Sequence, residues 1–81
     1  MEIKVLGSGC KKCNVLEANV RKAIESFDED IKVTKVSEIG EIMSYNVLIT
    51  PCLVINEMLV TSGKVSTVEE IIEMIKEKLN D

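Results

Sequence analysis

The sequence predicts an α/β domain built on a mixed β-sheet, and three observations support this prediction. Short runs at residues 2–6 and 52–55 are rich in β-forming side chains and border glycine or proline. Apolar residues recur at helical spacing in two longer segments, one in each half of the chain. No linker, repeat or low-complexity stretch separates these segments. We therefore expect a single domain, residues 1–81, with the element order β-α-β-α-β-β-α.

The first strand is expected at residues 2–6 and ends at Gly7 and Gly9. From Cys13 onwards, apolar side chains form the stripe of an amphipathic helix of about four turns. The members of this stripe are Leu16, Val20, Ala23, Ile24 and Phe27. Acidic residues 28–30 close the helix, and the apolar positions of 31–36 indicate a second strand.

The middle of the chain predicts a short helix and a hairpin. Ser37 can cap a helix that runs to about Ser44, although Gly40 weakens it. The residues expected to face inward are Ile39, Ile42 and Met43. Strands at 52–55 and 58–61 are separated by the dipeptide 56–57, and such loops favour a positive φ at both positions. Asparagine accepts this conformation readily and glutamate does not, so the turn signal is moderate.

The last helix has the strongest sequence signals. Both Ser66–Glu69 and Thr67–Glu70 match a capping box. An apolar stripe follows, formed by Val68, Ile71, Ile72, Ile75 and Leu79. With a right-handed parallel crossover at the start and an antiparallel hairpin near the end, the elements predict a four-stranded mixed sheet with helices on its faces.

Composition excludes several functional classes. The net charge of −4 and the interleaving of lysines with more numerous acids argue against nucleic-acid binding. The N-terminus lacks the apolar region of a signal peptide, and no apolar run is long enough to span a membrane. We expect a soluble, cytoplasmic monomer. The chain has no histidine, which removes the commonest general base and every histidine-containing metal site.

Cys10 and Cys13 are separated by two residues at the start of the first predicted helix. On one helix face their β-carbons would lie about 5–6 Å apart, whereas a disulfide needs about 3.8 Å, so a small adjustment of the turn opens or closes a bridge. Cys10 precedes the helix, where unpaired N–H groups favour a thiolate, and Cys13 should be more buried. This asymmetry predicts that Cys10 attacks and Cys13 resolves the mixed disulfide. A purely structural pair is the alternative.

Lys11 and Lys12 place two cations in the first turn of the helix, where they oppose the helix dipole. A thiolate nearby would explain this arrangement, so we expect both lysines to tune the site. The other interpretation is that they are solvated side chains with no role.

Thr50-Pro51 stands directly before the third predicted strand. Proline cannot donate to a β-ladder and therefore belongs at the first residue of a strand or at an edge. An X–Pro bond at this position could be cis, leaving the N–H and carbonyl of Thr50 free to face the backbone of a partner.

These features together resemble the thioredoxin/glutaredoxin superfamily, whose fold is a three-layer sandwich. Within it, "VLGSGCKKC", "STVEEI" and "TPCLVIN…SGKV" are similar to small thioredoxin-like proteins called redox-active disulfide protein 2. The resemblance implies Cys10 as nucleophile, Cys13 as resolving thiol and Pro51 as a cis-proline facing them. It also implies that Thr50 binds the substrate backbone and that Gly63 allows close approach next to the site. We expect Gly9, directly before Cys10, and Cys52 to tune the site. The Trp-Cys-Gly-Pro-Cys stretch of thioredoxins and their buried acid in the first strand are absent.

We therefore expect a thiol–disulfide oxidoreductase that carries electrons through Cys10 and Cys13 without another cofactor. Its partners would be a disulfide-containing protein or small molecule and an upstream dithiol reductase. The alternative is a carrier of a soft metal or metalloid, because thiolates at this spacing suit Cu(I). Cys52 belongs to this alternative as a third thiolate; otherwise it is a buried small hydrophobe or an alternative disulfide partner.

Overall fold

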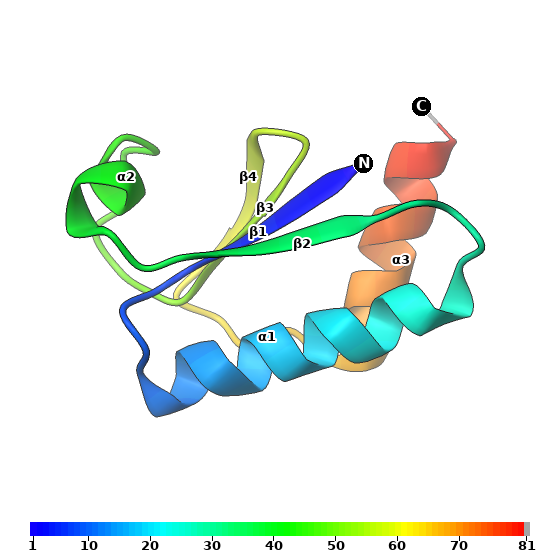
Figure 1. Cartoon of the computed structure of the whole chain (residues 1–81), viewed down its shortest axis with the longest axis horizontal. Coiled ribbons are helices and arrows are strands. Elements are labelled where there is room, and N and C mark those ends of the chain that lie inside the picture. The colour runs from blue at the N-terminus through cyan, green and yellow to red at the C-terminus, as the bar shows by residue number, and fades with distance from the viewer. Residues whose placement is uncertain (81) are drawn as a thin grey trace.

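A four-stranded mixed sheet forms the centre of the computed structural model, which describes residues 1–80 (Figure 1). The strands are β1 (Glu2–Leu6), β2 (Lys32–Val36), β3 (Cys52–Ile55) and β4 (Met58–Ser62). Their order across the sheet is β2-β1-β3-β4. Strand β1 pairs with β2 in parallel and with β3 antiparallel, and β3 and β4 form an antiparallel hairpin. The predicted element order and mixed sheet are confirmed.

Helices cover both faces of the sheet and create two separate cores. Helices α1 (Lys11–Ala23) and α3 (Val68–Leu79) share the larger core with alternate residues of β1 and β3. The short helix α2 (Ile39–Met43) belongs to the smaller core on the other side, at the opposite end of Figure 1 from α3. The structure is thus the predicted three-layer sandwich. Each fully buried aliphatic side chain in these cores contributes about 1.5–3 kcal/mol relative to an exposed one.

Strand β3 is buried on both faces and shows which core each side chain enters. Leu53 and Ile55 belong to the larger core, whereas Cys52 and Val54 belong to the smaller one. This alternation follows from the two-residue period of a β-strand. The side chain of Cys52 is therefore on the face of the sheet opposite to α1.

Helix α1 is shorter than the apolar stripe predicted. The α-helix ends at Ala23, and a 3₁₀ turn (Ile24–Ser26) follows it. Phe27 is already extended, with a φ of −121°. The tighter turn is common at helix ends, and here it redirects the chain towards β2.

The prediction for α2 was wrong in two respects. The helix begins at Ile39, with Glu38 rather than Ser37 at its N-cap position. Ile39 and Met43 are exposed, and Ile42 is the buried residue of this helix. The reason is that a five-residue helix offers little more than one turn, and Val47 and Tyr45 from the following loop pack into the same small core beside Ile42.

The turn of the β3–β4 hairpin has the conformation that its length predicts. Asn56 and Glu57 have φ values of 50° and 68°. The Glu57 carboxylate pairs with Lys4 at 2.6 Å, and Asn56 Oδ1 accepts a hydrogen bond from the Glu2 N–H at 3.0 Å. Strand β4 extends one residue beyond the predicted end, to Ser62.

Helix α3 uses one of the two predicted capping boxes. Thr67 Oγ1 accepts from the Glu70 N–H at 3.1 Å, and the Glu70 carboxylate accepts from the Thr67 N–H at 2.8 Å. Ser66 is buried just before the cap, where its carbonyl accepts a hydrogen bond from Asn19 of α1 at 2.9 Å. This bond joins the start of α3 to α1.

Candidate functional site

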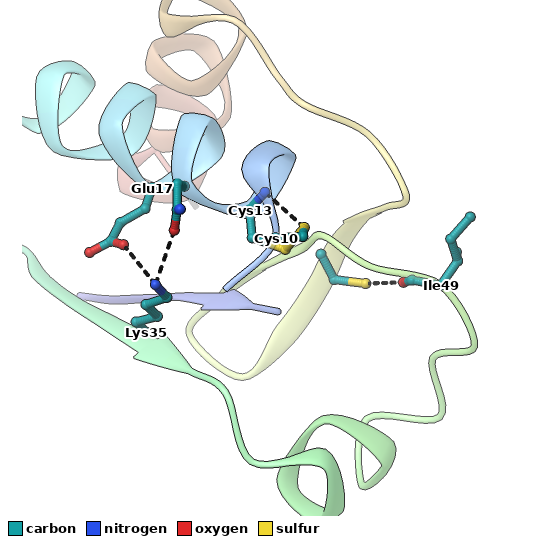
Figure 2. Close-up of a disulfide and its surroundings, with 7 residues drawn as sticks. Cys10, Cys13, Glu17, Lys35 and Ile49 are labelled. Atoms are coloured by element: carbon teal, nitrogen blue, oxygen red, sulfur yellow. Dashed lines mark hydrogen bonds and ion pairs between the residues drawn. A yellow bond between two sulfur atoms is a disulfide. The ribbon is translucent and has the colours of Figure 1, made fainter. Parts of the chain in front are cut away.

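A disulfide joins Cys10 and Cys13 at the N-terminus of α1, with the two α-carbons 5.0 Å apart (Figure 2). Cys10 is the N-cap of the helix, and its sulfur accepts a hydrogen bond from the Cys13 N–H at 3.1 Å. The Cys10 carbonyl accepts from the Asn14 N–H at 3.0 Å. The first sulfur therefore receives a backbone donor of the kind that stabilises negative charge at a helix start.

The two cysteines differ in their accessibility as the sequence predicted. Cys10 is exposed, whereas Cys13 is completely buried in the first turn of α1. A reagent or partner arriving from solvent thus meets Cys10 first, and Cys13 can be reached only from within the protein.

The surroundings of Cys10 are positively charged. The first turn of α1 contains no acidic residue, and both Lys11 and Lys12 are exposed. Within residues 1–80, neither lysine makes an ion pair. Their charges are therefore not neutralised by an ion pair among the described residues. Lys35 of β2 pairs with Glu17 of α1 at 3.8 Å, as Figure 2 shows, and also donates to Asn14 Oδ1 at 3.1 Å.

Gly7 is a site residue that the sequence reasoning missed. A β-carbon on Gly7 would lie 2.9 Å from the β-carbon of Cys13 and would overlap the Cys13 sulfur. Gly7 thus makes the space in which the buried half of the disulfide sits. The signal available in the sequence was a glycine directly after β1 and three residues before Cys10. Gly9, by contrast, is exposed with a φ of 84° and has open space around it, so it shapes the turn into α1.

Thr50 and Pro51 emerge at the same end of the sheet as the disulfide. Leu6 at the end of β1 pairs with Cys52 at the start of β3, so the segments 7–13 and 49–51 leave the sheet together. The Thr50–Pro51 peptide bond is cis, and Pro51 is buried. Thr50 belongs to no helix or strand. Among residues 1–80, no backbone group forms a hydrogen bond with its N–H or its carbonyl.

Gly63 lies across from this loop. Its N–H donates to the Pro51 carbonyl at 2.8 Å, and it has a φ of 69°. A β-carbon at this position would come within 3.0–3.2 Å of the Ile49 side chain. Gly63 therefore permits the close packing of the loop that contains Thr50 and Pro51, next to the predicted site.

Cys52 is buried and turned away from the larger core. Its sulfur donates to the Ile49 carbonyl at 2.8 Å, the contact drawn in Figure 2, and lies 3.8 Å from Ser62 Oγ. Among residues 1–80, no three or more Cys, His, Asp or Glu side chains are grouped so that they could hold a metal ion. The geometry does not favour the trithiolate site of the alternative hypothesis.

The loop before Pro51 also carries an apolar surface that the sequence did not reveal. Leu48 is fully exposed and Ile49 is 57% exposed. The apolar residues 47–49 have neither helical nor strand periodicity, so the sequence does not distinguish the exposed positions from the buried one.

Among residues 1–80, no helix is long and apolar enough to cross a membrane.

An exposed N-capping cysteine bridged to a buried one, with a cis-proline loop at the same end of a β2-β1-β3-β4 sheet, defines a thiol–disulfide oxidoreductase of the thioredoxin class. Comparisons with known proteins agree. The chain belongs to the thioredoxin domain family, whose family model matches residues 1–76. The predicted resemblance and function are confirmed.

Two archaeal thioredoxins are similar to the chain over most of its length. A thioredoxin of Methanocaldococcus jannaschii is 39% identical over 77 residues, which cover 95% of this chain and 88% of the relative. A thioredoxin of Methanothermobacter thermautotrophicus is 32% identical over 71 residues, which cover 88% of this chain and 92% of the relative.

Solved structures show the same fold. Thioredoxin 1 of Thermosipho africanus has a TM-score of 0.64 at 22% identity, and the match covers 99% of this chain and 96% of that one. A structure described as a malarial protein has a TM-score of 0.68 at 16% identity, with 96% of each chain covered.

Proposed function

We propose that the chain reduces disulfides of partner proteins, with Cys10 as the nucleophile and Cys13 as the resolving thiol. The observation that carries this assignment is the difference in accessibility, since Cys10 is exposed and Cys13 is fully buried. The thiolate is the reactive form of a cysteine. The Cys13 N–H and the uncompensated charges of Lys11 and Lys12 favour that form at Cys10.

The reaction consists of two exchanges. In the first, the Cys10 thiolate attacks one sulfur of the substrate disulfide, a Cys10–substrate disulfide forms, and the other substrate sulfur leaves as a thiolate. In the second, Cys13 loses its proton and attacks the Cys10 sulfur, the Cys10–Cys13 bond forms, and the second substrate thiolate leaves. Two electrons pass from the protein to the substrate, and two protons convert the released thiolates to thiols.

Protein substrates suit the loop beside the disulfide. The backbone groups of Thr50 are available to pair with an extended segment, as in strand addition. The exposed side chains of Leu48 and Ile49 offer apolar contact on the same loop. An upstream dithiol reductase would return the oxidised pair to the dithiol. We expect one domain, residues 1–81, that works as a monomer without a further cofactor.

A redox titration tests the couple. The protein is equilibrated in dithiothreitol buffers of graded potential, free thiols are alkylated, and mass spectrometry locates the label. We expect a reversible two-electron transition of Cys10 and Cys13, with Cys10 alkylated faster than Cys13 once both are reduced. Failure of the pair to oxidise, or faster alkylation of Cys13, would overturn the assignment.

A trapping experiment tests the roles separately. Cys13→Ser should retain a partner protein on Cys10 as a mixed disulfide, because the resolving thiol is absent. Cys10→Ser is the matched control and should retain none. Equal trapping by both variants would show that the two cysteines are interchangeable and would contradict the roles proposed here.

A further inference from the structure

The buried thiol of Cys52 takes no part in the two exchanges, yet it contacts the loop beside the disulfide. Its sulfur lies 2.8 Å from the Ile49 carbonyl oxygen, which is hydrogen-bond distance. Within residues 1–80, this thiol is the one donor to that carbonyl. The bond spans three residues along the chain and closes a turn around the Thr50–Pro51 peptide.

Two anchors hold this turn to the sheet, and they act on opposite sides of Thr50. On one side, the Pro51 carbonyl accepts from the Gly63 N–H at 2.8 Å. On the other, the Cys52 thiol holds the Ile49 carbonyl. Pro51 has no N–H of its own to supply the second bond. Without the thiol, the peptide between Ile49 and Thr50 would lose its only hydrogen-bonded restraint in the described part of the chain, and the Thr50 N–H belongs to that peptide.

We propose that Cys52 is a positioning residue for substrate binding: its S–H···O bond to Ile49 orients the Thr50 N–H for pairing with the backbone of a protein substrate. The inference rests on the proposed function of Thr50. It assigns Cys52 no electron transfer and no contact with substrate. Orientation of the loop affects the binding of an extended chain but not the chemistry at Cys10, so the effect falls on KM for proteins and not on kcat.

A simple space-filling role for Cys52 makes the opposite prediction about substitutions. A buried site that needs only an apolar side chain of this size accepts valine and is harmed by serine, whose hydroxyl is costly to bury without a partner. A site that needs a donor to Ile49 accepts serine and is harmed by valine. The ranking of Cys52→Ser and Cys52→Val therefore separates the two roles.

The experiment compares both variants with the wild type in reduction of a protein disulfide, insulin, and of a small aromatic disulfide reagent. We expect Cys52→Val to raise KM for insulin about two- to tenfold, the range that corresponds to loss of one hydrogen bond. We expect kcat, and the rate with the small reagent, to stay unchanged. Cys52→Ser should restore KM to near the wild-type value. Val54→Ala, which alters the same small core at a side chain that makes no hydrogen bond to Ile49, is the packing control.

The carbonyl-carbon chemical shift of Ile49 gives a second measurement that does not depend on stability. It should move in Cys52→Val and not in Val54→Ala. The inference would be overturned if Cys52→Val had the same KM for insulin as the wild type, or if Val54→Ala raised this KM as much as Cys52→Val does. A wild-type protein that reduced neither disulfide would instead contradict the proposed function, so the two failures are distinguishable.

Discussion

Gly7 contacts Cys13 so closely that a β-carbon on Gly7 would lie 2.9 Å from the Cys13 β-carbon. The backbone conformation of Gly7 is one that any residue can adopt, so the space for the Cys13 sulfur is what requires glycine here. We predict that Gly7→Ala lowers the free energy of unfolding by about 1–3 kcal/mol, the usual cost of overpacking a core. It should also slow release of the mixed disulfide, because the Cys13 sulfur is displaced.

Gly40→Ala is the matched control for Gly7→Ala, because a β-carbon on Gly40 has open space around it. Gly40 lies within α2, where alanine is favoured over glycine by about 0.5–1 kcal/mol. Urea unfolding of both variants measures the effect. The Gly7 prediction is wrong if the two variants are equally stable.

The charges of Lys11 and Lys12 should increase the thiolate population of reduced Cys10. Exposed charge pairs contribute about 0.2–1 kcal/mol, so Lys11→Glu and Lys12→Glu should each lower the thiolate population at neutral pH by roughly 1.4- to 5-fold. The rate of alkylation by a neutral reagent measures this, and the difference should shrink in high salt because of screening. Lys22→Glu, in the last turn of α1, is the control. Equal effects of all three substitutions would contradict a local role.

The pair of Lys4 and Glu57 should make stability depend on pH in the acid range. Hydrogen bonding to Lys4 lowers the pKa of Glu57 below its usual value, and the bonds to Glu57 and Tyr45 raise the pKa of Lys4. A lowered carboxylate pKa stabilises the fold above the unfolded-state pKa, and this contribution is lost as the pH falls through the folded-state pKa. Glu57→Gln should therefore be less stable than the wild type at about pH 7, and this difference should decrease towards about pH 3.

Denaturant unfolding at both pH values measures the effect of Glu57→Gln. Glu73→Gln serves as the control, because Glu73 makes only a long contact with Lys76 at 4.0 Å. If the difference in free energy of unfolding between the wild type and Glu57→Gln were the same at low pH, the ion pair would not be its cause.

Thr67 and Ser66 should respond differently to alanine, although both match a capping box in the sequence. Thr67→Ala removes the side chain that accepts from Glu70 and should cost about 1 kcal/mol. Ser66 Oγ is buried and has no hydrogen-bond partner among the described residues, and the bond from Asn19 goes to the Ser66 carbonyl. Ser66→Ala should therefore be neutral or stabilising. Thermal unfolding measures both, and a larger loss for Ser66→Ala would contradict the assignment of the cap.

Much of the fold could be predicted from local patterns. Strands β1 and β3 and helix α3 lie where periodicity and capping signals place them, because side-chain period and cap chemistry act over a few neighbouring residues. The prediction for α2 was less accurate. Whether Ile39, Ile42 or Met43 is buried depends on Val47 and Tyr45, which reach the same core from outside the helix. The periodicity of the helix does not indicate which residues outside it pack into the same core.

The sequence by itself determined the reactive pair. Spacing alone brings Cys10 and Cys13 onto the first turn of α1, and the unpaired N–H groups there distinguish the two sulfurs. Only the tertiary structure decided which groups surround that pair. The pairing of Leu6 in β1 with Cys52 in β3 brings the Thr50–Pro51 loop to the same end of the sheet as the disulfide, and it places the Cys52 side chain on the face opposite to α1. A contact between elements distant in the sequence depends on register and packing, and a motif of four residues specifies neither.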